Sequence, residues 1–264
     1  MDMASSNKKK VTAHQRQAKI TELIRKNQQV EIAELAALFD VSEMTVRRDL
    51  DHLAEQDHVV RTFGGAAISE KMEFQFDFAS RRRQNQKYKK LIAAEAAKLI
   101  QLGQKLILDT GTTTLELAYL LRSMQDVTVV TPSLAVASVL QFSPKVEVIL
   151  LGGIIREGSP DLTGSITEAV LDMFKVDIAF QGADGVGLDG EVYNSDTRIA
   201  KVDRKMRQRA ERIYLLVDSS KIGKTEFAVN GHVSEADGFI TDQRITRQQK
   251  KCLQKAGAKL IIAK

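Results

Sequence analysis

The chain has 264 residues, 43% of them hydrophobic, and a formal net charge of +5. This length suits two domains, and the basic balance permits a polyanionic partner without requiring one. The single cysteine excludes an intrachain disulfide, no apolar run is long enough to span a membrane, and the four histidines lack metal-ligand spacing.

The N-terminal region begins with the polar stretch MDMASSNKKK, which lacks the apolar segment of a signal peptide. We expect residues 1–11 to form a disordered tail and residues 12–68 to form a small helical domain. Apolar residues recur at helical spacing in two stretches, as Ile20, Leu23 and Ile24, and then as Ile32, Leu35, Ala36 and Phe39.

A third helix is predicted after the sequence DVS. Val46, Leu50 and Leu53 cluster on one side when successive residues are placed 100° apart. Ser42 suits the N-cap position. The exposed side and its flanks carry Met44, Thr45, Arg47 and Arg48, and we expect Asp49 to orient a neighbouring arginine.

The sequence HVVRTFGGAAIS then predicts two short strands around Gly64 and Gly65. Two helices, a turn, a capped helix and a hairpin follow one another as in a winged helix-turn-helix. In this motif the recognition helix enters the major groove, where arginine reads guanine or binds phosphate. The residues expected to contact DNA are Ser42, Met44, Thr45, Arg47, Arg48, Arg61 and Thr62. The alternative is that the third helix presents only a solvated face.

A polar, basic stretch over residues 69–89 is the predicted linker to a second domain, residues 90–264, which opens with a helix over residues 90–100. Apolar runs with the length of strands follow at residues 105–109, 127–131, 146–151, 176–182, 212–218, 238–241 and 259–263. Amphipathic helices separate several of them. This pattern predicts an α/β domain with a largely parallel sheet that is covered on both faces.

The first loop of this domain, in LILDTGTTTLELAYLL, joins a strand to a helix. Backbone N–H groups at a helix start favour an anion, and the carboxylate of Asp109 can accept from sugar hydroxyls. Gly111, Thr112, Thr113 and Thr114 complete the loop and indicate a site for a phosphorylated polyol. The loop has neither a Walker A nor a G-x-G-x-x-G pattern, and no cofactor is expected. Alternatively, Asp109 and Thr112 only cap the helix.

Further polar loops follow other predicted strands. Ligands of open α/β sheets bind outside the carboxyl ends of the strands, so we expect these loops to converge on one crevice. Their candidate effector-binding residues are Thr131, Ser133, Gly152, Gly153, Arg156, Gly182, Asp184, Gly185 and Lys221.

Residues 30–66, with the core VSEMTVRRDL and the ending RTFGGA, resemble the DNA-binding domain of the DeoR family of bacterial transcriptional regulators. The motifs DTGTTT, GG, GADG and DSSK resemble the sensor domain of the same family. Three departures stand out: Asp57-His58, where the family often has glycine; Pro132, where it often has asparagine; and Ile199, where it often has glutamate.

The resemblance implies a cytoplasmic, nucleoid-associated regulator, generally a repressor of sugar-catabolic genes, that binds operator DNA as a homodimer or homotetramer. A sugar phosphate would release it, and the sensor fold would be similar to ribose-5-phosphate isomerase and CoA-transferase-like proteins. One alternative is a phosphosugar isomerase-like enzyme fused to a DNA-binding module. Another is a DNA-binding protein whose second domain only oligomerises.

Overall fold

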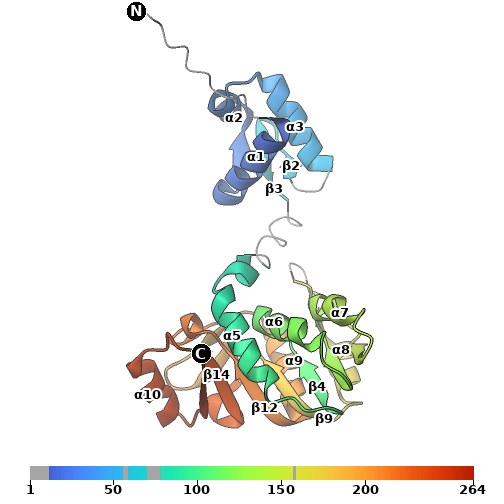
Figure 1. Cartoon of the computed structure of the whole chain (residues 1–264). Helices are drawn as coiled ribbons and strands as arrows, with labels where there is room; N and C mark the ends of the chain where they lie inside the picture. Colours follow the sequence, from blue (N-terminus) through green and yellow to red (C-terminus); the bar gives the residue numbers. More distant parts are fainter. Residues whose placement is uncertain (1–11, 56–58, 70–77, 79, 157–158) are drawn as a thin grey trace, which may run out of the picture. The chain divides into compact units, whose positions relative to one another are not determined.

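The computed structural model describes residues 12–55, 59–69, 78, 80–156 and 159–264. The chain divides into two compact units, Met1–Ser80 and Arg81–Lys264 (Figure 1). The predicted tail at residues 1–11, the departure at Asp57-His58 and most of residues 70–79 within the predicted linker lie outside the described residues.

The described part of the N-terminal unit contains helices and a small antiparallel sheet in the strand order β1-β3-β2. Its elements are α1 (Ala13–Asn27), β1 (Gln29–Glu31), α2 (Ile32–Phe39), α3 (Glu43–Glu55), β2 (Val59–Arg61) and β3 (Gly65–Ile68). The predicted hairpin is therefore present as β2 and β3. Strand β1 was not predicted, because three residues are too few to show the alternation of a strand.

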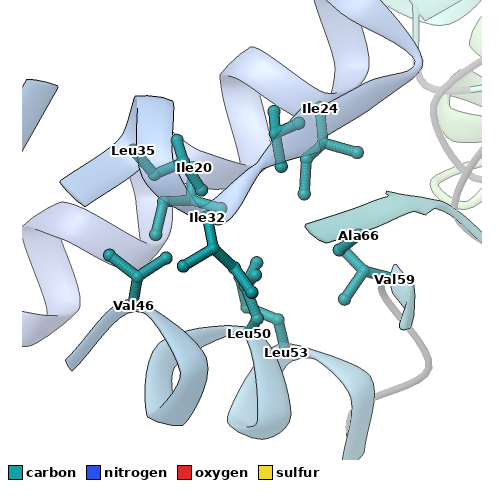
Figure 2. Close-up of a cluster of buried hydrophobic side chains, with 10 residues drawn as sticks. Ile20, Ile24, Ile32, Leu35, Val46, Leu50, Leu53, Val59 and Ala66 are labelled. Carbon is teal, nitrogen blue, oxygen red and sulfur yellow. The ribbon is translucent and has the colours of Figure 1, made fainter. Parts of the chain in front are cut away.

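One hydrophobic core joins these elements, as Figure 2 shows. Ile20 and Ile24 from α1 meet Val46 and Leu50 from α3, and all four are fully buried. The predicted apolar side of the third helix is thus confirmed. Ile32, Leu35, Leu53, Val59 and Ala66 extend the same cluster over α2, α3 and the hairpin.

The C-terminal unit is built on a seven-stranded parallel sheet in the order β15-β14-β12-β9-β4-β5-β6. Its strands are β4 (Lys105–Leu108), β5 (Val127–Thr131), β6 (Val146–Leu150), β9 (Val176–Gln181), β12 (Ala210–Leu216), β14 (Gly238–Asp242) and β15 (Leu260–Ala263). All seven predicted apolar runs form strands of this sheet, and the predicted parallel arrangement is confirmed.

Helices of this unit are α5 (Gln86–Ala97), α6 (Thr112–Leu121), α7 (Leu134–Leu140), α8 (Ser165–Leu171), α9 (Thr197–Gln208) and α10 (Arg247–Lys255), with short 3-10 turns at Ser219–Lys221 and Val233–Glu235. Ile107 of β4 packs in one cluster with Val202 and Met206 of α9. Leu106 and Leu108 point to the opposite face of the sheet and are also fully buried. Burial on both faces explains why these strands are apolar without alternation.

The start of α5 and several short strands of the C-terminal unit differ from the prediction made from the sequence. Helix α5 begins at Gln86 rather than at residue 90, so its first turn falls within the predicted linker. Short antiparallel strands were also missed, because none shows an apolar run of strand length. They are β7 (Ile154–Ile155), β8 (Leu162–Thr163), β10 (Gly185–Val186), β11 (Glu191–Asn194) and β13 (Ala228–His232).

Candidate functional site

The first candidate site is the outward side of α3. Met44, Arg47 and Arg48 are exposed there, opposite the buried stripe of Val46 and Leu50. Ser42 caps the helix, since its Oγ accepts from the backbone N of Thr45 at 3.3 Å. The two hydroxyls of Ser42 and Thr45 lie 3.0 Å apart. The start of α3 therefore presents hydroxyl groups, a thioether and cations to solvent.

Two arginines of α3 differ in their surroundings. The Arg47 guanidinium lies 3.5 Å from Glu43, one helical turn earlier, in an exposed pair of the kind that contributes little to stability. The Arg48 side chain has no hydrogen bond or ion pair with any residue that the structure describes. Arg48 is therefore the more available of the two for an external anion.

Asp49 does not orient a neighbouring arginine as we had expected. It is buried, and its Oδ2 accepts from Arg16 Nε of α1 at 2.5 Å while its Oδ1 accepts from Gln17 Nε2 at 3.0 Å. The helical rotation between Arg48 and Asp49 turns the carboxylate toward α1. Asp49 thus holds α1 against α3 and lies away from the outward side.

The hairpin residues lie beside the same side of α3. Arg61 Nε is 3.0 Å from Asp51 Oδ1, and Arg61 Nη1 donates to the carbonyl of Gly65 at 2.9 Å. The backbone N of Thr62 also donates to that carbonyl, at 3.1 Å. Since Asp51 belongs to the exposed side of α3, the end of β2 is fixed next to the helix surface that carries Arg48.

The second candidate site is a cavity of about 110 Å³ in the C-terminal unit. It lies at the carboxyl ends of β4, β9 and β12, where parallel strands of an open sheet bind ligands. Eight of the predicted effector residues line it, namely Asp109, Gly111, Thr112, Thr113, Arg156, Gly182, Asp184 and Lys221. The convergence of three separate loops is therefore present in the fold.

The other predicted effector residues do not line this cavity. Thr114 donates to Asp109, Thr131 donates to the carbonyl of Leu108, and Ser133 caps α7. The loop after β5 is covered by residues 160–162, because Leu134 N donates to Pro160 O and Leu162 N donates to Pro132 O. The remaining residues outside the lining are Gly152, Gly153 and Gly185.

Asp109 joins two of the loops. Its Oδ1 accepts from the backbone N of Gly111 at 2.8 Å, and its Oδ2 accepts from the backbone N of Gly182 at 2.5 Å. Burial raises the pKa of this carboxyl, while hydrogen bonds from Thr114, Gly182 and Gly111 oppose the rise. Asp109 therefore ties the β4–α6 loop to the end of β9, and its direct contact with an effector stays a prediction.

The cavity has a cationic side that the sequence prediction found only in part. Lys221 and Lys224 line it, and neither side chain has an ion-pair or hydrogen-bond partner among the described residues. Helix α6 starts there with Gly111 at the N-cap and no side-chain cap, which leaves its positive end open to a ligand. Positive charge and an open helix start together favour an anion.

Lys89 of α5 belongs to the same cationic side and was missed because it falls within the predicted linker. It is only 5% exposed, and its Nζ donates to Thr112 Oγ1 at 2.8 Å. Burial lowers the pKa of Lys89 to about 8, with Lys221 and Arg81 adding to the fall and Asp218 opposing it. An anion in the cavity would raise the pKa of Lys89 again and stabilise its charged form.

Arg156, predicted as a phosphate ligand, is already paired. Its guanidinium lies 2.7 Å from Asp161 Oδ2 and 3.8 Å from Asp196 Oδ2. The other oxygen of Asp161 is buried and has no hydrogen-bond partner among the described residues. Asp161 itself lines the cavity, and a buried acceptor without a partner is uncommon in folded proteins.

A buried polar network forms the floor of the cavity. Asp203 of α9 accepts from Asn194 Nδ2 at 2.9 Å and from Asn230 Nδ2 at 3.0 Å. Burial raises the pKa of Asp203 well above its usual value, the charge of Asp109 adds to the rise, and Arg207 opposes it. Ile199 also lines the cavity, which gives this departure from the family pattern a place in the site.

The start of α5 closes one wall of the cavity. Asn85 Nδ2 donates to Asp218 Oδ1 and to Ser220 Oγ, both at 3.0 Å. Further along the helix, the Arg244 guanidinium stacks on the Tyr88 ring, 3.6 Å from its centroid, and pairs with Asp242 at 3.0 Å. The segment that leaves the N-terminal unit is thus bound to the same loop that carries Lys221.

Features of two other protein classes are absent from the described part of the chain. No helix there is both long enough and apolar enough to cross a membrane. No group of three His, Cys, Asp or Glu side chains there is arranged to hold a metal ion.

Comparison with known families matches both units. Residues 16–72 match the DeoR-like helix-turn-helix domain, and residues 84–243 match the DeoR C terminal sensor domain.

Similar proteins extend over nearly the whole chain. It is 32% identical to the putative aga operon transcriptional repressor of Escherichia coli O157:H7, over 98% of this chain and 97% of that protein. It is 31% identical to the glycerol-3-phosphate regulon repressor of Escherichia coli K12, over 86% and 90%. Among solved structures, ribose 5-phosphate isomerase A of Methanocaldococcus jannaschii covers 52% of this chain and 55% of its own, with 22% identity and a TM-score of 0.40.

Proposed function

The chain belongs to the DeoR family of transcriptional regulators, and on that premise we propose that it represses genes of sugar catabolism until a phosphorylated sugar binds its sensor domain. The prediction of a regulator rather than an enzyme is confirmed by the family and by relatives that are named as repressors. The choice of effector rests on the cavity, where Lys221 and Lys224 have no partner among the described residues and Asp161 has one carboxylate oxygen without a hydrogen bond.

Operator binding is assigned to the outward side of α3. We propose that Arg48 contacts a base edge or phosphate in the major groove, with Arg47 and the capping hydroxyl of Ser42 beside it. Arg48 has no described partner to give up, whereas Arg47 has to leave Glu43 or share it. Arg61 and Thr62 would lie near phosphates at the end of β2, as the sequence predicted.

Effector binding is assigned to two sides of one cavity. The phosphate group would lie at the start of α6, near Thr112, Lys89 and Lys221, where positive charge converges. The hydroxyl groups would lie toward Asp161 and Asp184, which offer carboxylate oxygens. A relative that carries glycerol-3-phosphate in its name supports a phosphorylated polyol as the class of ligand.

Relief of repression requires a ligand that binds two states of the protein unequally. Lys89 and Asn85 lie at the beginning of α5, directly after the chain leaves the N-terminal unit, and both are bonded to cavity residues. A phosphate that draws Lys89 away from Thr112 would change how this segment is held. We propose that the start of α5 is the element through which the sensor communicates with the DNA-binding unit.

The test begins with thermal unfolding of the full-length protein in the presence of pentose, hexose and triose phosphates. A ligand of the folded state raises the apparent stability by mass action. Matched free sugars and inorganic phosphate separate binding of the whole effector from binding of either part. The compound that stabilises the protein should then lower its affinity for operator DNA at fixed salt.

Other results would favour the alternatives. Stabilisation without any change in operator affinity would favour a domain that only oligomerises. Sustained interconversion of a sugar phosphate would favour an isomerase-like activity. We also propose that the protein is a homodimer or homotetramer, because paired half-sites on DNA are bound by symmetric proteins. We propose that it acts in the cytoplasm, at the nucleoid. Light scattering of the free protein tests the subunit count.

A further inference from the structure

The turn between β2 and β3 carries a large apolar side chain with nothing over it. Phe63 is fully exposed, with a relative accessibility of 106%. Singly exposed apolar side chains are common on protein surfaces, so what distinguishes Phe63 is its size, its fixed backbone and its place beside α3. Val60, 56% exposed on β2, is the other large apolar side chain exposed on this hairpin.

The backbone of this turn is fixed from several directions. The carbonyl of Gly65 accepts from Thr62 N at 3.1 Å and from Arg61 Nη1 at 2.9 Å. The carbonyl of Gly64 accepts from the backbone N of Ile32 at 2.9 Å. A Cβ atom on Gly65 would lie 1.9 Å from the carbonyl oxygen of Val30, so β1 packs directly against this residue. Phe63 is therefore presented on a rigid turn, and binding through it orders little backbone.

The turn also lies next to the side of α3 that is proposed to bind DNA. Arg61, two residues before Phe63, is 3.0 Å from Asp51 on the exposed side of that helix. Arg48 is exposed on the same side. When α3 enters a major groove, a projection beside it reaches the adjacent backbone and minor groove.

We propose that Phe63 enters the minor groove next to the site of α3 and wedges between two base pairs, partly unstacking them. This inference rests on the proposed DNA binding and adds to it a residue that senses how easily the duplex deforms. Phenylalanine is among the apolar residues that act as such wedges, and pyrimidine–purine steps unstack most easily. A protein partner is less favoured, because Arg48, exposed on the adjacent side of α3 without a partner among the described residues, suits a phosphate group better than an apolar interface.

The test uses the full-length protein and a duplex that the wild-type protein selects from a random pool. 2-Aminopurine is placed in turn at each step flanking the bases protected by α3, and its fluorescence reports unstacking. Phe63→Ala should lower affinity on the order of tenfold and abolish the fluorescence rise. Phe63→Leu should keep most of the affinity and most of the fluorescence rise, since leucine can also act as a wedge. Phe142→Ala, at a residue that is 85% exposed in the C-terminal unit, is the matched control and should change neither.

A second arm replaces the unstacked pyrimidine–purine step with a stiff A-tract step. Wild-type affinity should fall, and the affinity of Phe63→Ala should stay the same, because the variant no longer deforms that step. Equal affinity and equal fluorescence for wild type and Phe63→Ala would overturn the proposal. So would a change in subunit count in Phe63→Ala with intact DNA binding, which would make Phe63 a protein contact. If the wild-type protein selects no duplex, the proposed DNA binding itself fails, and that result is distinct from both.

Discussion

In the N-terminal unit the arginine proposed to meet DNA lies in solvent, whereas in the C-terminal unit the lysine nearest the open start of α6 is buried. Arg48 is exposed and needs no change of environment to reach a phosphate or base. Lys89 is 5% exposed, and burial lowers its pKa to about 8. A long polyanion can be bound by charges left in water, whereas a small anion needs a preorganised site with little water.

The two units also use buried charge differently. Asp49 and Arg16 form a buried pair that joins two helices. Asp109, Asp161 and Asp203 instead gather around one cavity, where the charge of Asp161 raises the pKa of Asp109 and the charge of Asp109 raises the pKa of Asp203. The first arrangement holds two helices together, and the second lines the cavity that is proposed to bind the effector. Four substitutions test this contrast, from the largest expected effect to the smallest.

The first substitution, Asp49→Ala, removes one partner of the buried pair in the N-terminal unit. It leaves Arg16 buried without its carboxylate, which costs about 3–5 kcal/mol of folding free energy. Hydrogen exchange of the full-length protein should show loss of protection in α1 and α3. Asp51→Ala is the control, since its exposed pair with Arg61 is worth about 0–1 kcal/mol. Equal protection in the two variants would mean that Asp49 is not a packing residue.

Lys89→Met tests whether the buried cation serves the ligand. Loss of a charge-assisted hydrogen bond should weaken binding of the sugar phosphate by about 1.5–3 kcal/mol, measured by calorimetry. Lys87→Met, at an exposed lysine of the same helix, is the matched control and should bind the sugar phosphate as tightly as the wild-type protein. An unchanged dissociation constant in Lys89→Met would remove this residue from the site.

The pH dependence of Lys89 sharpens the same test. Its folded pKa of about 8 lies below the usual 10.5, so between these values the unfolded chain holds a proton that the folded chain has lost. The contribution of Lys89 to the free energy of unfolding therefore rises with pH through this window. Effector affinity should fall over the same window, because the cation is lost. Both trends should be absent in Lys89→Met.

Arg48→Ala tests the exposed side of the comparison. Operator affinity should fall by about 1–3 kcal/mol if the arginine contacts a base with two hydrogen bonds. Stability and effector binding should be unchanged, because Arg48 has no partner among the described residues. Arg122→Ala, at an exposed arginine of the C-terminal unit, is the control for overall charge. Titration at fixed salt that gave wild-type affinity for Arg48→Ala would rule out this contact.

The smallest effect is expected at the start of α5. Asn85 has a φ of +57°, so Asn85→Gly keeps the backbone conformation while removing the amide that binds Asp218 and Ser220. The effector should still bind, but its effect on operator affinity should shrink by about 0.5–1.5 kcal/mol. The quantity to measure is the ratio of operator affinities with and without effector. If this ratio were the same in Asn85→Gly as in the wild-type protein, the signal would pass through another element.

Much of the fold was predictable from local patterns. Val46, Leu50 and Leu53 fixed the buried side of α3, and the seven apolar runs became the seven strands of the parallel sheet. The loops with Asp109, Gly182 and Lys221 were expected to converge, because carboxyl ends of parallel strands share one edge of a sheet. The short antiparallel strands were not predictable, since they have only two to five residues and show no apolar run of strand length.

The sequence by itself therefore determined the family, the element types and the edge of the sheet at which the cavity lies, because periodicity and loop composition are local properties. Only the tertiary structure decided the partners of individual charges. Asp49 turned inward to Arg16, Arg156 paired with Asp161, and Lys89 reached Thr112 from a stretch that had looked like a linker. These pairings depend on which surfaces are buried together, and burial sets the cost of leaving each charge alone.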